Sequence, residues 1–373
     1  MSLPTLPRDL IKEIFSYLPV KPLVRFTSIS KHYKSLIFDS EFIKLHLQRS
    51  PKHAHVLLTL HDVVDMEDFW VLTPCSVRYS LEHPPSIVKE DECRGFKDNT
   101  YYTIGSTNGL VCLISDKEEN NGVKTICVRF WNPTLRLRSK KSPSLTITTS
   151  SDLHFGFGYD DSSHTYKVVA VFWDVTTQKW EGRVHCMGDS FWRETLASPE
   201  FPVLLESTVG LFVNGSVNWF ARNEQLVIFS LDLQKETGKY LSLPAGFNED
   251  INDISALAVL RGCLCFCYDH MQTHFVLWEM RKFGVEDSWT RLVNVSYAHL
   301  QFDNIQNDWL LVPVCLSEND VLLLVSKEVP DDGIMYNLRD DRVEHIELPD
   351  TNIWYADEHM QSLVVPLPHP HPH

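Results

Sequence analysis

The chain has 373 residues, of which 43% are hydrophobic and 22% charged, and its formal net charge at pH 7 is −15. This composition is typical of a soluble globular protein, and no apolar run approaches the length of a membrane span, which excludes a helical membrane protein. Charged residues from Arg8 to Glu13 interrupt the N-terminus where a secretory signal needs an apolar stretch, so we expect a cytoplasmic or nuclear protein.

Charge is distributed unevenly along the chain. Residues 1–53 contain nine Lys or Arg against four Asp or Glu, a net charge of +5, so the remaining residues carry −20. A basic segment beside an acidic body is compatible with nucleic-acid binding. However, these positive residues are spread over several expected helices and no stacking aromatics accompany them. We therefore expect an independent basic module without a nucleic-acid partner.

The first fifty residues predict three or four short helices. Pro7 suits the first turn of a helix, and Pro19 ends that helix. Ser30 is the expected N-cap of a third helix, and Asp39 or Ser40 that of a fourth. The apolar residues of the first helix recur at helical spacing and are Leu10, Ile11, Ile14 and Leu18. So many helices in so short a segment leave little room for a core, so part of the apolar surface is expected to contact another protein.

This segment resembles a known family. The matching residues are Leu6-Pro7-Arg8-Asp9-Leu10 with Glu13-Ile14, then Leu18-Pro19-Val20-Lys21 with Leu23, Arg25 and Phe26, then Ser30-Lys31, Leu36-Ile37 and Phe42. They are similar to the F-box, the helical module by which the substrate receptor of a ubiquitin ligase binds its Skp-type adaptor. The resemblance implies that nine residues contact the adaptor or hold the geometry of its contact surface, namely Leu6, Pro7, Leu10, Ile11, Ile14, Leu18, Pro19, Leu23 and Phe26. Any one of them could instead only pack the helices together.

The nine cysteines fit a reducing compartment, because they are scattered and odd in number. Cys263, Cys265 and Cys267 alternate along one expected strand and would point to the same face. We interpret them as small hydrophobic residues of a core, with a metal cluster as the alternative. The sequence contains no Cys-x-x-Cys pair to suggest zinc, no Gly-rich phosphate loop with its lysine and no His-Glu-x-x-His helix, so we expect neither a metal nor a cofactor.

From about residue 54 onward the hydrophobic pattern alternates as in β-strands. The predicted strands are Gly109–Ile114, Thr125–Trp131, Phe155–Tyr159, Tyr166–Phe172, Arg183–Met187, Leu211–Phe220, Leu226–Leu233, Leu257–Cys267, Phe275–Met280, Val321–Val325 and Val343–Leu348. Turn signals such as Asn108-Gly109 and Asn214-Gly215 separate them. Strands this numerous and this closely spaced indicate an all-β domain.

A loose repeat narrows the architecture to a β-propeller. Strand-end patterns recur at intervals of about fifty residues, and each interval holds about four strands, the size of one propeller blade. The segments Val56–Leu60 and Ser362–Val365 are both strand-like, so an early strand is expected to pair with a late one and close the ring. Five to seven blades fit the length, and six is our preferred number.

This region also resembles a family. The blocks are Ser106-Thr107-Asn108-Gly109-Leu110-Val111-Cys112, Trp131-Asn132-Pro133-Thr134, Phe155-Gly156-Phe157-Gly158-Tyr159-Asp160 with Tyr166-Lys167-Val168-Val169, and Val213-Asn214-Gly215-Ser216-Val217-Asn218-Trp219. They are similar to the F-box-associated interaction domain of plant F-box proteins, which implies a kelch-like propeller that binds a target protein. By their chemistry alone, we interpret Trp131 as filler between blades and the Gly156 and Gly158 pair as a site of close strand approach.

Binding is expected to use loops at one end of the ring, with Asp174–Trp180 and Phe302–Trp309 as candidates.

Catalytic motifs in the sequence are weak. Gly188-Asp189-Ser190 resembles an esterase nucleophile block, but we expect Phe191 and Trp192 to continue a strand there, whereas such a serine needs a tight turn. The basic run from Arg136 to Lys141 is interpreted as a solvated strand edge. For the His369–His373 tail we expect fraying, with weak metal binding as the alternative.

The sequence therefore predicts an F-box in residues 1–50, a propeller in 54–368 and a His/Pro tail in 369–373. The expected function is that of a non-enzymatic substrate receptor, which the adaptor links to a cullin and a RING protein while the ring holds a target protein for ubiquitination. Neither nucleic acid nor a membrane is an expected partner. The alternatives are a propeller enzyme or glycan-binding protein with an incidental helical cap, and a decoy receptor that delivers no target.

Overall fold

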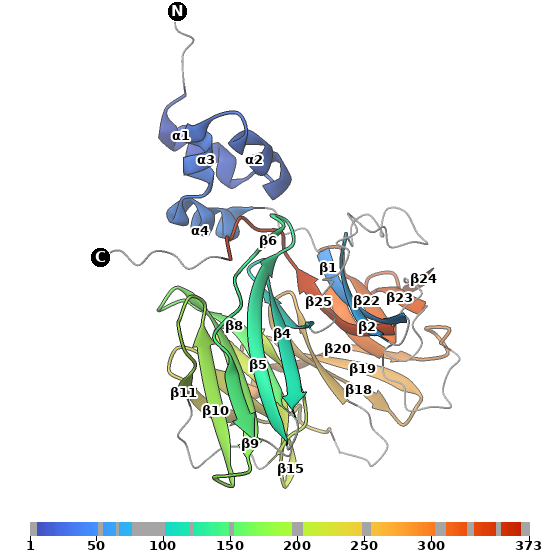
Figure 1. Ribbon diagram of the computed structural model, residues 1–373. Coiled ribbons are helices and arrows are strands. Elements are labelled where there is room, and N and C mark those ends of the chain that lie inside the picture. Colours follow the sequence, from blue (N-terminus) through green and yellow to red (C-terminus); the bar gives the residue numbers. More distant parts are fainter. Residues whose placement is uncertain are drawn as a thin grey trace, which may run out of the picture.

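The structure is a computed structural model, and it describes residues 6–50, 55–64, 67–76, 101–119, 122–148, 153–195, 204–247, 255–302, 311–326, 332–347 and 352–366. A helical module lies at the N-terminal end, and an all-β body follows it (Figure 1). None of the described helices is both long enough and apolar enough to cross a membrane.

The helical module consists, within the described residues, of α1 (Arg8–Ser16), α2 (Val20–Thr27), α3 (Lys31–Ile37) and α4 (Ser40–Arg49). Two helix starts are fixed by side chains, as predicted. The Ser30 side chain accepts a hydrogen bond from the backbone N–H of His32, and the Asp39 carboxylate accepts one from the N–H of Phe42, each at 3.1 Å. Thus Asp39, rather than Ser40, caps the fourth helix.

Antiparallel pairing groups the described strands into six sheets, which we call blades 1 to 6. Blade 1 contains β25 (Asn352–His359), β1 (His55–Val64) and β2 (Glu67–Ser76). Blade 2 contains β3 (Tyr102–Thr107), β4 (Leu110–Glu119), β5 (Val123–Asn132), β6 (Leu137–Arg138) and β7 (Leu145–Thr148). Blade 3 contains β8 (His154–Asp160), β9 (Thr165–Asp174), β10 (Lys179–Cys186) and β11 (Arg193–Thr195).

The remaining strands form the other half of the body. Blade 4 contains β12 (Leu204–Leu205), β13 (Val209–Val213), β14 (Ser216–Asn223), β15 (Gln225–Asp232) and β16 (Thr237–Leu241). Blade 5 contains β17 (Ser255–Leu260), β18 (Cys263–His270), β19 (His274–Met280) and β20 (Trp289–Ser296), with the short helix η1 (Glu286–Ser288) before β20. Blade 6 contains β21 (Leu311–Leu316), β22 (Val321–Ser326), β23 (Asp332–Asn337) and β24 (Arg342–Glu347).

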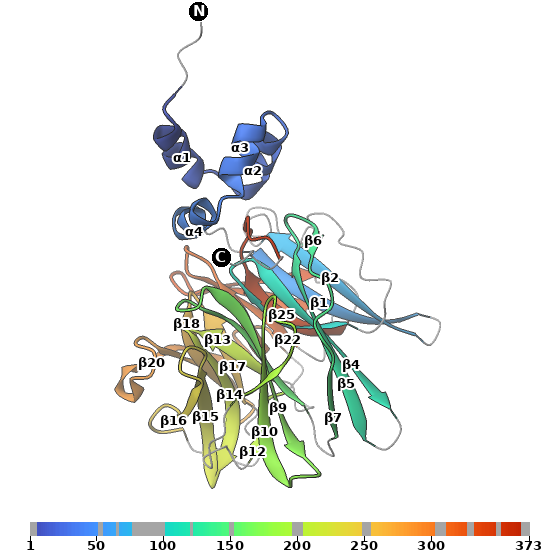
Figure 2. The ribbon, with the colours of Figure 1, turned by 60° about the vertical axis from the view of Figure 1, so that its left-hand side comes forward.

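The six blades form a closed ring. One strand of each blade contacts its counterpart in the next blade, in the cycle β3, β8, β13, β17, β21, β25 and back to β3. Figure 2 shows the blades from a second direction, with the helical module above one end of the ring. The body is therefore a six-bladed β-propeller, which confirms the predicted fold class and the preferred number of blades.

An early strand and a late strand close the ring, as the sequence predicted. β25 pairs with β1 in the antiparallel direction, for example Leu57 opposite Asp357. The predicted late strand was wrong, however. Ser362–Val365 follows β25 and lies outside the sheets, and its backbone carbonyls accept hydrogen bonds from a side chain of blade 2 rather than from a neighbouring strand.

Two predicted strands are hairpins. Leu211–Phe220 is divided at Asn214 and Gly215 into β13 and β14, which pair with each other. The segment Leu257–Cys267 was expected to be continuous, but β17 and β18 pair with each other across a turn at Arg261 and Gly262, whose φ angles are 51° and 76°. The guanidinium of Arg261 donates to the backbone carbonyl of Leu316 at 3.3 Å and to the Asp320 carboxylate at 2.7 Å. These contacts help to hold a non-glycine residue in a left-handed conformation that it rarely adopts.

Close approach between blades 3 and 4 explains Gly156 and Gly158 of the block Phe155–Asp160. A methyl group on Gly156 would lie 2.5 Å from Val217 and 2.7 Å from Trp219, and one on Gly158 would lie 2.2 Å from the ring of Phe212. The Trp219 indole is fully buried and donates to the backbone carbonyl of Phe155 at 3.0 Å. The predicted role of the glycine pair is confirmed, since only residues without a side chain leave room for Trp219 beside Gly156 and for Phe212 beside Gly158.

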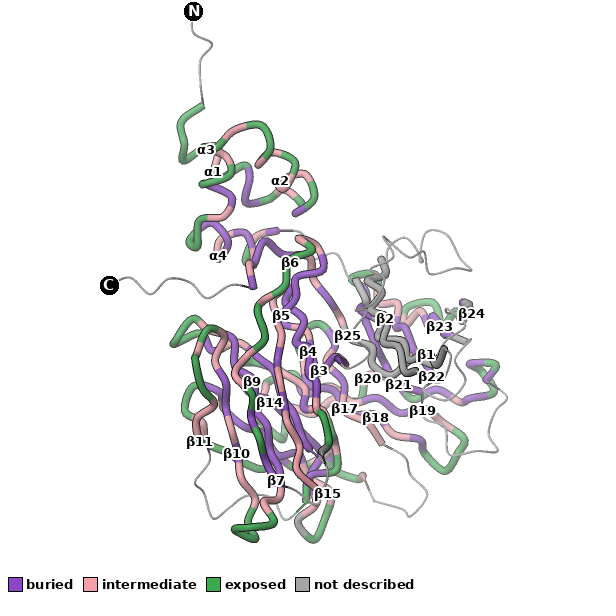
Figure 3. The backbone as a smooth tube through the Cα atoms, in the orientation of Figure 1, coloured by how far each residue is buried: buried purple, intermediate pink, exposed green. Residues whose placement is uncertain are grey.

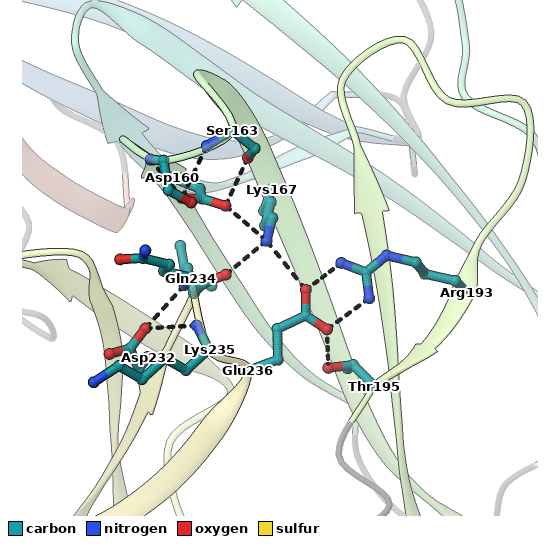
Figure 4. Close-up of polar contacts among 11 residues, drawn as sticks. Asp160, Ser163, Lys167, Arg193, Thr195, Asp232, Gln234, Lys235 and Glu236 are labelled. Atoms are coloured by element: carbon teal, nitrogen blue, oxygen red, sulfur yellow. Dashed lines mark hydrogen bonds and ion pairs between the residues drawn. The ribbon is translucent and has the colours of Figure 1, made fainter.

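A buried group of charges also joins blades 3 and 4 (Figure 4). The Lys167 ammonium lies 2.9 Å from the Asp160 carboxylate and 3.1 Å from that of Glu236, and it donates to the carbonyl of Leu233 at 2.6 Å. Arg193 forms a two-pronged ion pair with Glu236. Although burial alone raises the pKa of Glu236, hydrogen bonds led by Arg193 lower it to about 2. The carboxylate therefore stays ionised, and the group acts as an electrostatic clip between the blades.

Candidate protein-interaction surface

Exposed apolar side chains gather on the helical module. The described residues include twelve large hydrophobic residues that are exposed, and five of them lie within the first 29 residues of the chain. These five are Leu6, Leu10, Ile14, Tyr17 and Ile29. The other seven are distributed over the much longer ring. Because contiguous apolar surface on a soluble protein marks a contact site, the helices are the strongest candidate interaction surface.

Helix α1 separates two apolar faces. Leu10 and Ile14 lie one turn apart and are 50% and 51% exposed, while Ile11 packs against the core and Phe15 is buried within it. Figure 3 shows this mixture of exposed and buried positions in the helices. A single-sided amphipathic helix would bury its apolar residues and expose its polar ones. α1 instead keeps a second apolar face uncovered.

The nine residues that the sequence nominated fall into three groups. Exposed members are Leu6, Pro7, Leu10, Ile14 and Pro19; half-buried members are Ile11, Leu18 and Phe26; Leu23 is fully buried. Phe26 stacks on Phe15 with ring centroids 5.1 Å apart. Pro7 and Pro19 occupy the positions just before α1 and α2. Leu23, Phe26 and the two prolines thus shape the module, while the exposed aliphatic residues offer apolar area to a partner.

Sequence reasoning missed two members of this surface. Tyr17 is 55% exposed, and the Arg49 guanidinium lies over its ring at 5.5 Å. Ile29 is 68% exposed, the largest fraction among these residues, and it lies between α2 and the cap of α3. Tyr17 continues the spacing of Leu10 and Ile14 by three residues, so helical periodicity was the signal for it. Ile29 follows the end of α2, where periodicity gives no signal.

Polar contacts fix α1 against α4. His46 is fully buried, and its Nε2 atom lies 2.8 Å from the carbonyl oxygen of Leu18 at the end of α1. Burial lowers the pKa of His46, although this backbone contact opposes the effect. Arg49 pairs with Glu13 at 2.7 Å. These contacts with α4 therefore fix the orientation of α1 and of its exposed apolar face.

The first of the two candidate binding loops on the ring is mainly architectural. Asp174 accepts hydrogen bonds from the backbone N–H groups of Thr176 and Thr177, at 2.7 and 2.8 Å, and these bonds, led by that of Thr177, lower its pKa. Trp180 packs edge-on against Trp173, with centroids 5.9 Å apart. Of the second loop, Phe302 is buried, and residues 303–309 lie outside the described residues.

The structure places part of the candidate catalytic and metal motifs, while the His369–His373 tail lies outside the described residues. Residues 188–192 form the turn between β10 and β11, so the expectation that Phe191 and Trp192 continue a strand was wrong. Next to this turn, His185 packs against Trp192, with ring centroids 5.2 Å apart. Cys265 and Cys267 belong to a buried hydrophobic cluster, as interpreted from sequence, whereas Cys263 is only partly buried and lies outside that cluster. Within the described ranges, no group of three or more His, Cys, Asp or Glu side chains could hold a metal ion.

Two protein-family models match the chain. The model of the F-box associated beta propeller domain matches residues 59–366, and that of the F-box domain matches residues 3–45. The F-box/kelch-repeat protein At3g23880 of Arabidopsis thaliana is 28% identical over 308 residues, covering 78% of this chain and 79% of the relative. F-box protein CPR1 of the same plant is 28% identical over 321 residues, covering 78% and 73%.

Solved structures are more distant. The fucose-specific lectin from Aleuria aurantia has a TM-score of 0.39 at 8% sequence identity, covering 81% of this chain and 98% of the lectin. A structure from a study of two prolyl endopeptidases has a TM-score of 0.42 at 10% identity, covering 84% of this chain and 46% of that chain.

Proposed function

Because this chain belongs to the family of the F-box associated beta propeller domain, we propose that it is the substrate-recognition subunit of a Skp-cullin-F-box ubiquitin ligase. In this proposal, residues 1–50 bind a Skp-type adaptor and residues 54–368 bind a target protein. The adaptor connects the chain to a cullin and a RING protein. The observation that carries the proposal is the uncovered apolar face of α1 within a segment that matches the F-box domain.

The apolar face and the charge of the module support an encounter with the adaptor. Leu10, Ile14 and their exposed neighbours supply area whose removal from water favours association, at about 25 cal/mol per Å² of buried apolar surface. The net charge of +5 over residues 1–53 attracts an acidic partner over longer distances. In F-box proteins, the adaptor surface tends to be acidic, so charge speeds the encounter and apolar burial holds the complex.

The receptor contributes proximity rather than chemistry. It holds lysines of the target near the ubiquitin thioester carried by a partner enzyme, which raises their effective concentration. The relatives that match the chain are themselves F-box proteins, which supports a non-catalytic role. We propose that the protein performs this role in the cytoplasm or nucleus.

Affinity capture tests the proposal. The full chain and a chain lacking residues 1–45 are captured from cells of the source plant with the proteasome blocked, and co-purified proteins are identified. We expect adaptor and cullin only with the full chain, and the target with both. If the full chain is folded and captures no Skp-family adaptor, the proposal is wrong. Capture of adaptor and target without ubiquitination of that target would identify a decoy receptor instead.

A further inference from the structure

The last described residues of the chain form a buried segment outside the sheets. Residues 360–366, which we call the C-terminal strap, follow β25 and belong to no helix or strand. Ser362 and Leu363 are fully buried, and Val364 is 6% exposed. Buried backbone outside a sheet needs hydrogen-bond partners from elsewhere. The strap receives them from blade 2.

Asn132, at the end of β5, holds the strap. Its side-chain amide group donates to the carbonyl of Ser362 at 3.0 Å and to that of Val364 at 2.7 Å. Its side-chain oxygen accepts a bond from the backbone N–H of Leu135 at 3.0 Å, which fixes the orientation of the amide. The Asn132 side chain is fully buried. A buried amide with partners for both its donor and its acceptor positions specifies one position of the bound backbone.

The turn between β3 and β4 forms the other side of this seat. Gly109 has a φ of +76°, and a methyl group placed on it would lie 2.3 Å from the Ser362 hydroxyl and 2.7 Å from the carbonyl of Met360. Only glycine satisfies both the backbone angle and the close approach. The notch between Gly109 and Asn132 is therefore shaped for the strap.

The strap lies between the ring and the helical module. Both views show it beside α4, at the end of the ring that faces the helices (Figures 1 and 2). Phe42 and Ile43 of α4 belong to the same continuous hydrophobic cluster as Leu363 and Val364 of the strap. The covalent connection is short, because α4 ends at Arg49 and β1 begins at His55. A short connection limits distance, but packing is needed to fix orientation.

We propose that the C-terminal strap fixes the orientation of the helical module on the ring, and that Asn132 is the residue that positions it. This inference rests on the proposed function, since orientation matters only if one module holds an adaptor and the other a target. The strap makes the two modules one stiff body, so that a bound target is presented to the ligase at a restricted distance and angle. Release of the strap should leave both binding surfaces intact and broaden the distribution of that distance.

The experiment measures the distance between the modules in four forms of the protein. These are the full chain, a chain ending at Pro366, a chain ending at His359, and Asn132→Leu. Spin labels are attached through a non-natural amino acid at Ser35 of α3 and Lys179 of β10, which are both exposed. Cysteine labelling is avoided because Cys127 and Cys186 are only partly buried. Tryptophan fluorescence during thermal unfolding reports whether the ring is intact.

We expect a narrow distance distribution for the full chain and for the chain ending at Pro366, which keeps the strap and loses only the tail. The chain ending at His359 should give a distribution about twofold broader or more, because an untethered short linker samples many orientations. Asn132→Leu should broaden it in the same direction. Adaptor binding should be unchanged in all four forms, while ubiquitin transfer to a bound target should fall in the last two.

A distribution that stays narrow in the chain ending at His359, with the ring still folded, overturns the inference. If that truncation unfolds the ring, Asn132→Leu decides the question by the same measurement, since it removes only the amide contacts. Failure of the proposed function has a different signature. In that case no form binds an adaptor, whereas the distance distributions still report on the strap.

Discussion

The helical module and the ring differ in how far they bury their apolar side chains. The module buries residues such as Phe15 and Leu23 but leaves Leu10, Ile14 and Ile29 at least half exposed. The ring packs large side chains such as Trp219 completely between its blades, and its exposed hydrophobic residues are scattered. A segment of about fifty residues has too little interior to cover its own apolar residues, whereas a closed ring has no such shortage. Substitutions in the ring should therefore mainly change fold stability, whereas substitutions on the helical module should mainly change partner binding.

The largest expected effect is a loss of ring stability when the charged group between blades 3 and 4 is broken. Lys167→Met removes the cation between Asp160 and Glu236. It should lower the free energy of unfolding of the ring by about 3–5 kcal/mol, because the buried Asp160 carboxylate then has no cation beside it, whereas Glu236 keeps Arg193. Chemical denaturation followed by tryptophan fluorescence measures this change. The matched control is Lys179→Met, at an exposed position, with an expected change below about 0.5 kcal/mol. Equal effects of the two variants would contradict the role of the buried charges.

The second effect concerns binding by the helices without a change in fold. Leu10→Asp should weaken adaptor binding by about 100-fold or more, since a carboxylate in an apolar contact loses its hydration without compensation, at a cost of about 3 kcal/mol. Isothermal titration calorimetry with a purified Skp-type adaptor measures the change. Val175→Asp places the same charge on an exposed apolar position of the ring and should leave binding unchanged. Undiminished binding by folded Leu10→Asp would show that the adaptor uses another face.

Acid should destabilise the helical module through His46. Burial lowers the pKa of this histidine in the folded state below its ordinary value of 6.5, so the unfolded chain binds a proton more readily. The associated stability is fully present above pH 6.5. It is lost as the pH falls below that value, by at most about 1.4 kcal/mol per pH unit.

Hydrogen exchange in the full chain measures how the stability of the helical module depends on pH, because it reports on the helices separately from the ring. The protection of amides in α1 and α4 is compared at pH 7 and pH 5, after correction for the intrinsic exchange rates. In His46→Gln, the difference between the two pH values should shrink for these helices. An unchanged pH dependence in this variant would assign the acid sensitivity to another group. Burial also lowers the pKa of His185 in the ring. Because His46→Gln leaves His185 in place, the pH dependence of exchange in blade 3 should not change and serves as an internal reference.

The smallest effect defines the edge of the interaction surface. Ile29→Ser should change the free energy of unfolding by less than about 0.5 kcal/mol, because the side chain is 68% exposed. If the turn between α2 and α3 contacts the adaptor, the variant should weaken binding by about 1 kcal/mol, or roughly fivefold. Binding equal to that of the unmodified chain would confine the surface to α1 and its flanks.

Local chemistry made the helices and most hairpins predictable from sequence. Ser30 and Asp39 are side chains that cap helices, and Asn108-Gly109 is a pair that adopts the required positive φ angles. Arg261-Gly262 makes the same type of turn but was missed. An arginine holds that conformation only with the help of Leu316 and Asp320, which are distant in the sequence.

Contacts between distant segments set the limit of prediction at the candidate site. Periodicity identified Leu10 and Ile14 as apolar positions of α1, but it could not separate them from Leu23, which the fold buries completely. From the sequence, Asn132 was identified only as part of a family block. Its partners, Ser362 and Val364, lie more than two hundred residues later, and no local pattern connects them.

Closure of the ring by its first and last strands imposes an order of events during synthesis. The four helices are complete once Arg49 has left the ribosome, whereas β1 can pair with β2 at once but closes the ring only when β25, which begins at Asn352, is available. At translation rates of about 5–20 residues per second, the wait for β25 lasts roughly 15 to 60 seconds. Under the proposed function, a nascent chain could therefore bind the adaptor before its ring is able to bind a target. Prematurely terminated products would keep the helices without a finished ring, and under the same proposal they would compete with complete chains for the adaptor.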